Sequence, residues 1–87
     1  MNNNNLSFNK SKDIDLGLLY LNGKKYELAI ETFNKVLKIN PKNETALVKL
    51  GHVYLQQKKL SEAIAQFSKA LELNPQNADS HEGLGFC

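Results

Sequence analysis

The residue types that titrate nearest neutral pH are few in this chain: two histidines, His52 and His81, and one cysteine, Cys87. The string Asp79-Ser80-His81 holds the residue types of a hydrolase triad. Consecutive side chains on a helix point in different directions, however, so these three cannot hydrogen-bond in series. His81 and Cys87 also lack the paired Cys or His spacings of a metal site. We therefore expect no enzymatic activity, no cofactor and no bound metal.

The composition limits the classes of partner. The chain has 87 residues, with eleven lysines, no arginine, nine acidic residues and a net charge of +2. Because the lysines are mixed among carboxylates and no guanidinium group is present, we expect no nucleic-acid partner. No stretch approaches the roughly 18 to 20 apolar residues that cross a bilayer, so we expect no membrane partner.

The start of the chain and its cysteine content indicate a compartment. Residues 1–9 are rich in asparagine and lack the charged start and apolar run of an export signal. A single cysteine, Cys87, excludes a disulfide within the chain. We therefore expect a cytoplasmic protein.

The elements that position any site follow from an internal repeat. Residues 10–43 align without a gap on residues 44–77, and fourteen of the 34 positions are identical. A period of this size marks a supersecondary unit that cannot bury its apolar face alone and therefore stacks on its neighbour. The predicted organisation is a disordered Asn-rich lead at 1–9, one repeat at 10–43, a second at 44–77, and the truncated first helix of a third at 78–87.

Apolar residues that recur at intervals of three and four predict two helices in each repeat. The predicted helices cover residues 11–21, 26–39, 44–57, 60–73 and 78–87. Asn40-Pro41 and Asn74-Pro75 should end the second helix of each pair. Asn9, Asn43 and Asn77 are placed to cap the first helices. We expect Gly23 to take the left-handed conformation in the first turn.

The recurring residues resemble the tetratricopeptide repeat. The segments Leu16-Gly17-x-x-Tyr20, Ala29-x-x-x-Phe33 and Pro41 recur as Leu50-Gly51-x-x-Tyr54, Ala63-x-x-x-Phe67 and Pro75. The resemblance covers residues 10–87 and implies an all-α, right-handed α-solenoid of about five helices in antiparallel pairs. The chain departs from the pattern at the family's tryptophan position, which holds Asp13, Leu47 and His81.

The glycines of the pattern predict close helix packing. Glycine in a helix interior costs about 1 kcal/mol relative to alanine, so Gly17 and Gly51 need a packing reason. We expect Ala29 and Ala63 to lie opposite them. The aromatic side chains of the two repeats should fill the space beside the contact; they are Tyr20, Phe33, Tyr54 and Phe67. Gly83 and Gly85 should weaken the last helix.

The resemblance also implies protein recognition on a concave surface lined by the first helix of each repeat. The residues expected to contact a partner are Ile14, Leu18, Leu21, Val48, His52 and Leu55. We predict a non-catalytic interaction module, or scaffold, that binds a peptide or helix segment along this face, with Leu18 and Leu55 as anchors. The same face could instead be covered by the N-terminal lead or by further repeats.

Two alternatives to a partner-binding module remain open. One is the accessory repeat array of a larger enzyme, such as a glycosyltransferase or a kinase. The other is a self-associating structural fragment that forms a homo-oligomer through its open C-terminal repeat.

One known use of the family can be compared position by position. Co-chaperones of this family grip a chaperone's terminal carboxylate with basic and asparagine side chains. The equivalent positions here hold Ile14, Leu18, Lys49, Asp79 and Gly83. None has the expected residue, so we predict no binding of that kind.

Overall fold

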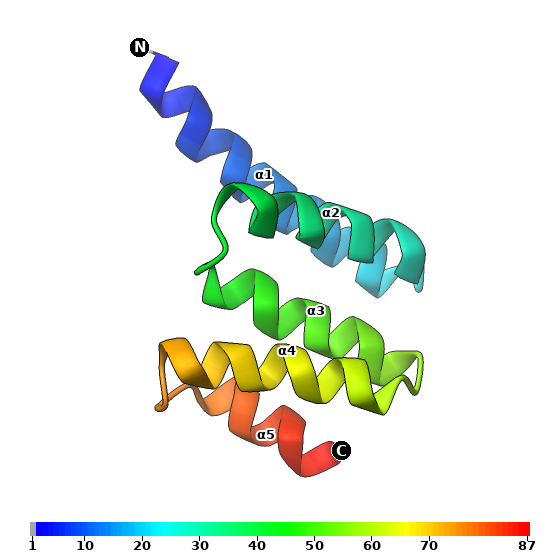
Figure 1. The fold of residues 1–87 in the computed structure, drawn as a ribbon. Coiled ribbons are helices and arrows are strands. Elements are labelled where there is room, and N and C mark those ends of the chain that lie inside the picture. Colours follow the sequence, from blue (N-terminus) through cyan, green and yellow to red (C-terminus); the bar gives the residue numbers. More distant parts are fainter. Residues whose placement is uncertain (1) are drawn as a thin grey trace.

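Repeated stop signals divide the chain into five helices. The computed structural model describes the backbone of residues 2–87 and the side chains of residues 12–87. The helices are α1 (Asn2–Asn22), α2 (Tyr26–Ile39), α3 (Glu44–Gln56), α4 (Leu60–Leu73) and α5 (Ala78–Phe86), and the described residues contain no strand. Each helix contacts the next along the chain, and the helices stack in order (Figure 1). The predicted all-α solenoid of helix pairs is confirmed.

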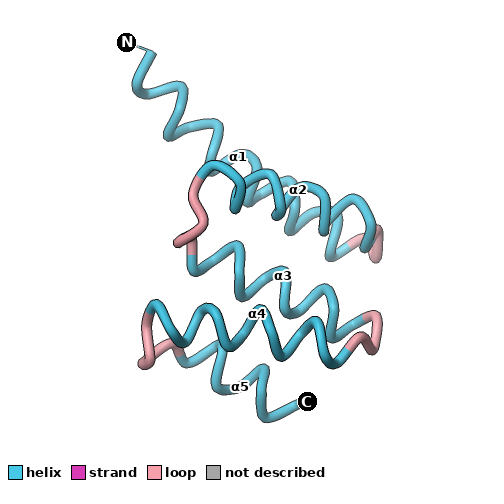
Figure 2. The backbone as a smooth tube through the Cα atoms, in the orientation of Figure 1, coloured by secondary structure: helices cyan, strands magenta, loops and turns pink. Residues whose placement is uncertain are grey.

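Short loops alternate between the two sides of the stack, as Figure 2 shows. The loops between repeats follow the asparagine signals. Asn43 accepts a hydrogen bond from the Ala46 N–H at 3.0 Å, and Asn77 accepts one from the Ser80 N–H at 2.8 Å. These two N-caps are therefore confirmed.

Helix α1 starts earlier than the sequence predicted. Its backbone is helical from Asn2, where we expected a disordered lead over residues 1–9. No proline or glycine stands between Asn2 and Leu16, so nothing in the sequence stops the packed part of the helix from continuing toward the N-terminus. Asn9 consequently lies inside α1 rather than at its cap, and its side chain lies outside the described residues.

In the turn within each repeat, a lysine takes the left-handed conformation that ends the first helix. Lys24 and Lys58, which are 34 residues apart, have φ angles of 62° and 63°, and no described glycine has a positive φ. The Lys25 N–H donates to the Tyr20 carbonyl at 2.8 Å, the long hydrogen bond of a Schellman motif. The prediction for Gly23 was therefore wrong. Its N–H still donates to Leu19 at 3.0 Å, so it continues the helix by one residue.

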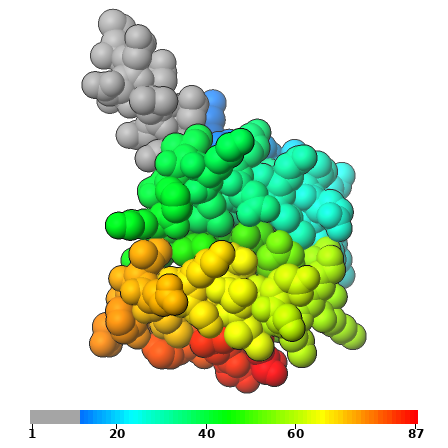
Figure 3. Space-filling model, viewed as in Figure 1, coloured from blue at the N-terminus to red at the C-terminus, as the bar shows by residue number. Residues whose placement is uncertain are grey.

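Two apolar clusters form the core. The first joins α2 and α3 and consists of Ala29, Phe33, Val36, Ala46, Leu50 and Val53. The second joins α3 and α4 and consists of Leu47, Val48, Ala63, Phe67 and Ala70. The space-filling view in Figure 3 shows mainly the outer surface of α2 and α4, which covers these clusters from one side.

The glycines make room for aromatic rings rather than for alanines. A Cβ atom added to Gly17 would lie 2.6 Å from the Phe33 ring, and one added to Gly51 would lie 2.7 Å from the Phe67 ring. A Cβ atom on Gly83 would come within 2.4 Å of the same Phe67 ring. Gly83 is therefore a packing residue, whereas a Cβ atom on Gly85 would meet nothing within 4 Å.

Candidate functional site

The first helices of the units lie closer together than the second helices. Helix α3 contacts both α1 and α5, whereas the described residues of α2 and α4 make no contact with each other. A stack whose members approach on one side and separate on the other curves toward the closer side. The surface formed by α1, α3 and α5 is therefore the inner surface of the curve, as the sequence predicted for its binding face.

Three of the predicted contact residues lie on α1. Ile14, Leu18 and Leu21 are each half-buried and pack against the first core cluster. Their spacing of four and three residues places them on one side of the helix. Part of each side chain supports the core, and the remaining part is free to meet a partner.

The central helix α3 supplies the others, but it differs from α1 in its surroundings. It contacts all four other helices, so most of its apolar surface is covered. Val48 is buried in the second core cluster and offers no surface to a partner, contrary to its prediction as a contact residue. Leu55, close to the end of α3, is half-buried and packs against the same cluster.

His52 is the polar member of the predicted set. Its ring meets Phe67 edge-on, with centroids 5.3 Å apart and planes at 77°. Burial lowers the pKa of His52, and the nearby Lys49 ammonium lowers it further, while Asp79 and Glu82 act in the opposite direction. The imidazole is therefore neutral at pH 7, and its free edge can donate or accept a hydrogen bond.

The charges around His52 were not among the predicted contact residues. Lys49 is half-buried on α3, and Asp79 and Glu82 are exposed on α5, so the inner surface changes from aliphatic at α1 to charged at α5. The resemblance does place Lys49 and Asp79 at positions of the family's binding surface, but only aliphatic residues and His52 were predicted as contacts.

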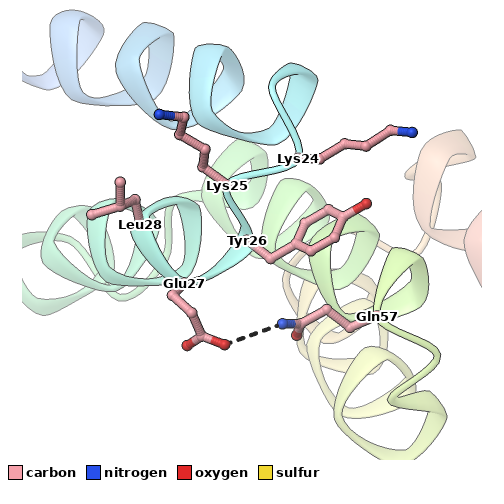
Figure 4. A pocket seen from close by; sticks show the side chains of 6 residues that line it. All are labelled: Lys24, Lys25, Tyr26, Glu27, Leu28 and Gln57. Carbon is pink, nitrogen blue, oxygen red and sulfur yellow. Dashed lines mark hydrogen bonds between the residues drawn. The ribbon is translucent and has the colours of Figure 1, made fainter.

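A separate hollow of about 330 Å³ lies at the turns within the repeats, away from the inner surface (Figure 4). It is lined by Lys24, Lys25, Tyr26, Glu27, Leu28 and Gln57. The Gln57 side-chain N–H donates to the Glu27 carboxylate at 3.4 Å, and the two lysine side chains point in different directions. The charged side chains around the hollow therefore do not converge on a common point where a ligand could bind.

The residues that could suggest a hydrolase do not converge. Ser80 is fully buried, whereas Asp79 and His81 are exposed. The Nε2 atom of His81 lies 2.8 Å from the Pro75 carbonyl oxygen. Among the described residues no three His, Cys, Asp or Glu side chains gather as metal ligands. Within the part of the chain that the structure describes, every helix is too short or too polar to cross a lipid bilayer.

Comparisons with known proteins agree with this architecture. A family model for the TPR repeat matches residues 17–58 and 51–86. Among solved structures, a mutant of MamA superposes with a TM-score of 0.77 at 33% sequence identity. The match covers 90% of this chain and 57% of that chain, so this chain spans little more than half of its length. No curated protein matches the sequence.

Proposed function

Because the chain belongs to the tetratricopeptide repeat family, we propose that it binds a segment of another protein along its inner surface. Repeats of this family generally mediate protein–protein interaction and are typically non-catalytic. The proposed contact set, called the inner wall below, consists of Ile14, Leu18, Leu21, His52 and Leu55.

The observation that carries the proposal is the half-buried state of the wall's aliphatic residues. Leu18 and Leu55 pack on the core with one side and keep the other side free. Such side chains are already ordered, so a partner that covers them loses little of their conformational entropy. Full burial of one leucine-sized side chain is worth about 1.5–3 kcal/mol, and two anchors give micromolar affinity only with further contacts.

The charges beside the inner wall suggest the polarity of the partner. Asp79 and Glu82 lie exposed on α5, which contacts α3, whereas the aliphatic residues of α1 lie on the opposite side of α3. A complementary segment has apolar side chains at the α1 end and a lysine or arginine at the α5 end. Segments of this kind bind in extended or helical form in grooves lined by aliphatic residues.

The test is selection of peptides from a random library displayed on phage, with the wild type and two variants as bait. The double variant Leu18→Ser/Leu55→Ser should lose the selected peptides. The variant Leu28→Ser is the matched control, because Leu28 is an exposed leucine on α2, outside the inner wall. It should retain them.

Circular dichroism separates lost binding from lost folding. Equal helical content in all three proteins, with binding lost only in the double variant, supports the inner wall. Peptides that bind the double variant as well as the wild type would place the contact elsewhere. If the selected peptides lack a basic residue, Asp79 and Glu82 do not contact a lysine or arginine of the partner.

A further inference from the structure

We propose that the edge of the stack formed by the two turns within the repeats binds an acidic segment of another protein, in which an apolar side chain is flanked by carboxylates. The four lysines of these turns are called the lysine edge below; they are Lys24, Lys25, Lys58 and Lys59. Figure 2 shows both turns on the same side of the stack. The lysine edge contains no residue of the inner wall, so this binding and the proposed function can be tested separately.

The two turns contact each other. Gln57, which directly precedes Lys58, donates a side-chain N–H to the Glu27 carboxylate at 3.4 Å. The hollow of about 330 Å³ lies where the turns meet, since residues 24–28 line it from the first turn and Gln57 lines it from the second. The two lysine pairs therefore belong to one continuous surface.

The four ammonium groups have no partner within the part of the chain that the structure describes. All four lysines are exposed, and none forms a side-chain hydrogen bond or an ion pair with a described residue. The nearby carboxylates of Glu27 and Glu62 lie toward Tyr54: burial raises the pKa of the Tyr54 hydroxyl, and the two carboxylates raise it further. The lysine edge therefore offers positive charge that no described carboxylate pairs with.

Lysine is an unfavourable residue at each of these four positions. Lys24 and Lys58 have φ angles of 62° and 63°, where glycine avoids the strain of a side chain. Lys25 and Lys59 are the N-caps of α2 and α4, and neither side chain forms a capping hydrogen bond. An ammonium group is also unfavourable at the positive end of a helix dipole. Local structure therefore does not explain the lysines, whereas contact with an anionic partner does.

The arrangement of the charges fits an extended ligand. Lys24 and Lys25 point in different directions in Figure 4, so their ammonium groups cannot meet a single anion together. Carboxylates spaced along a peptide can reach them one at a time. A peptide can also place neutral residues opposite Glu27 and Glu62, whereas every nucleotide of a nucleic acid has a phosphate charge. The charge pattern therefore favours a polypeptide over a nucleic acid.

The hollow adds an apolar contact to these charges. Figure 4 shows the ring of the half-buried Tyr26 between Lys24 and Gln57. The lysines of the first turn also line the hollow, and the stem of a lysine side chain is aliphatic. The volume of the hollow is at the lower limit of the roughly 300–1,000 Å³ of ligand pockets, so it suits one large side chain. We therefore expect a leucine or phenylalanine among the glutamates or aspartates of the partner.

Titration of the isotope-labelled 87-residue chain with a synthetic peptide, followed by NMR, tests the proposal. The peptide has one leucine between two pairs of glutamates, with serine and glycine elsewhere. The amide signals of residues 24–28 and 57–60 should shift, and those of the inner wall should not. Added salt should weaken the binding, because it screens ion pairs on an exposed edge. A peptide with serine in place of the leucine should also bind more weakly.

Two double variants, each without two lysines that are 34 residues apart, locate the contact. Lys24→Gly/Lys58→Gly removes two charges from the edge and should raise the Kd roughly three- to tenfold. It also relieves the strain at positive φ, so unfolding cannot explain its weaker binding. Lys35→Gln/Lys69→Gln is the matched control, because both lysines are exposed within α2 and α4, away from the turns. It should leave the Kd nearly unchanged.

Three outcomes would overturn the proposal. Absence of shifts at the two turns with the peptide in large excess would show that the lysine edge is only a solvated rim. An equal rise in Kd for the two double variants would show that the peptide responds to net charge alone. Tighter binding of single-stranded oligothymidylate than of the peptide would assign the edge to a nucleic acid. Leu18→Ser/Leu55→Ser should bind the acidic peptide like the wild type, which separates this test from that of the inner wall.

Discussion

The two repeats place the same aromatic residue in different surroundings. Phe33 and Phe67 are both fully buried at equivalent positions. Phe33 lies against one glycine, Gly17 of α1, whereas Phe67 lies against Gly51 of α3 and Gly83 of α5. The second ring therefore holds a helix on each side at the distance that only glycine permits.

The difference explains how a short last helix stays docked. Helix α5 buries only Ser80 and Gly83, neither of which has a large apolar side chain. Its docking rests on the close approach of Gly83 to the Phe67 ring and on Leu84, which is half-buried and packs against the second core cluster. The helix that docks on the first repeat is α3, where the position equivalent to Gly83 is Lys49, and this longer helix docks through large apolar residues instead.

The largest expected effect comes from removing the rings. Phe33→Ala and Phe67→Ala should each cost about 3–5 kcal/mol in free energy of unfolding, since each leaves a cavity in the core. The free energy of unfolding of the whole chain should be roughly 4–13 kcal/mol, so either substitution removes a large part of it. Phe67→Ala should also release α5 and lower the helical content before any denaturant is added. Urea titrations followed by circular dichroism measure both, and equal native-state ellipticity in the two variants would contradict the distinction.

A methyl group on the glycines should have the next largest effect. Gly51→Ala and Gly83→Ala should each destabilise by about 1–3 kcal/mol, because the Phe67 ring cannot move from one helix without approaching the other. Gly17→Ala should cost less, since Phe33 meets a single glycine.

Gly85→Ala is the matched control for this series. Nothing lies within 4 Å of its added methyl group, so the gain in helix propensity, at most about 1 kcal/mol, should appear as a higher urea midpoint. The ranking is wrong if Gly83→Ala is as stable as Gly85→Ala.

Both repeats have a lysine in the left-handed conformation, so substitution of either lysine by glycine should change the stability by the same amount. Lys24→Gly and Lys58→Gly should each stabilise by about 0.5–1 kcal/mol, because a side chain at positive φ is strained and glycine is not. Thermal melts of the two single variants and the double variant measure this. Additive increases in Tm are expected, and a decrease in either single variant would contradict the strain.

The smallest effect concerns His52, whose equivalent in the first repeat is Leu18. The unfolded chain protonates this residue near pH 6.5, and the folded chain does so only at lower pH because burial lowers the pKa. Below pH 6.5 the unfolded state therefore binds more protons, and the free energy of unfolding falls as the pH falls toward the folded-state pKa. Above pH 7 this contribution is fully present.

His52→Leu is the test, since it gives the second repeat the residue of the first. The wild type should lose more stability than the variant between pH 7 and pH 5, and the two should have parallel profiles between pH 7 and pH 8. Parallel profiles over the whole range would show that the environment of His52 does not affect its protonation.

The sequence predicted the parts of the fold that depend on local signals. Asparagine and proline set the ends of α2 and α4 at the predicted residues, and Asn43 and Asn77 cap as expected, because each signal acts on its own helix end. The left-handed conformation was predicted for Gly23 because glycine is the usual residue at the C-terminal end of a helix. In the structure α1 continues through the Gly23 N–H, and Lys24 is the residue with the left-handed conformation.

The errors at the site came from contacts between units. The burial of Val48 depends on four neighbours around α3, which a single-helix pattern does not contain. The role of Gly83 depends on where α5 crosses Phe67, two residues before the place that the repeat period assigns to glycine. The inner wall itself stays a prediction, supported by the half-buried state of its leucines.

The position of α3 has a consequence for the order in which the molecule opens. All four other helices contact α3, so unfolding that starts at either end of the stack reaches α3 last. Its amide protons should exchange with deuterium most slowly, and those of α5 and of the N-terminal part of α1 should exchange most rapidly. A partner that spans the inner wall would then slow exchange at the ends far more than at the centre.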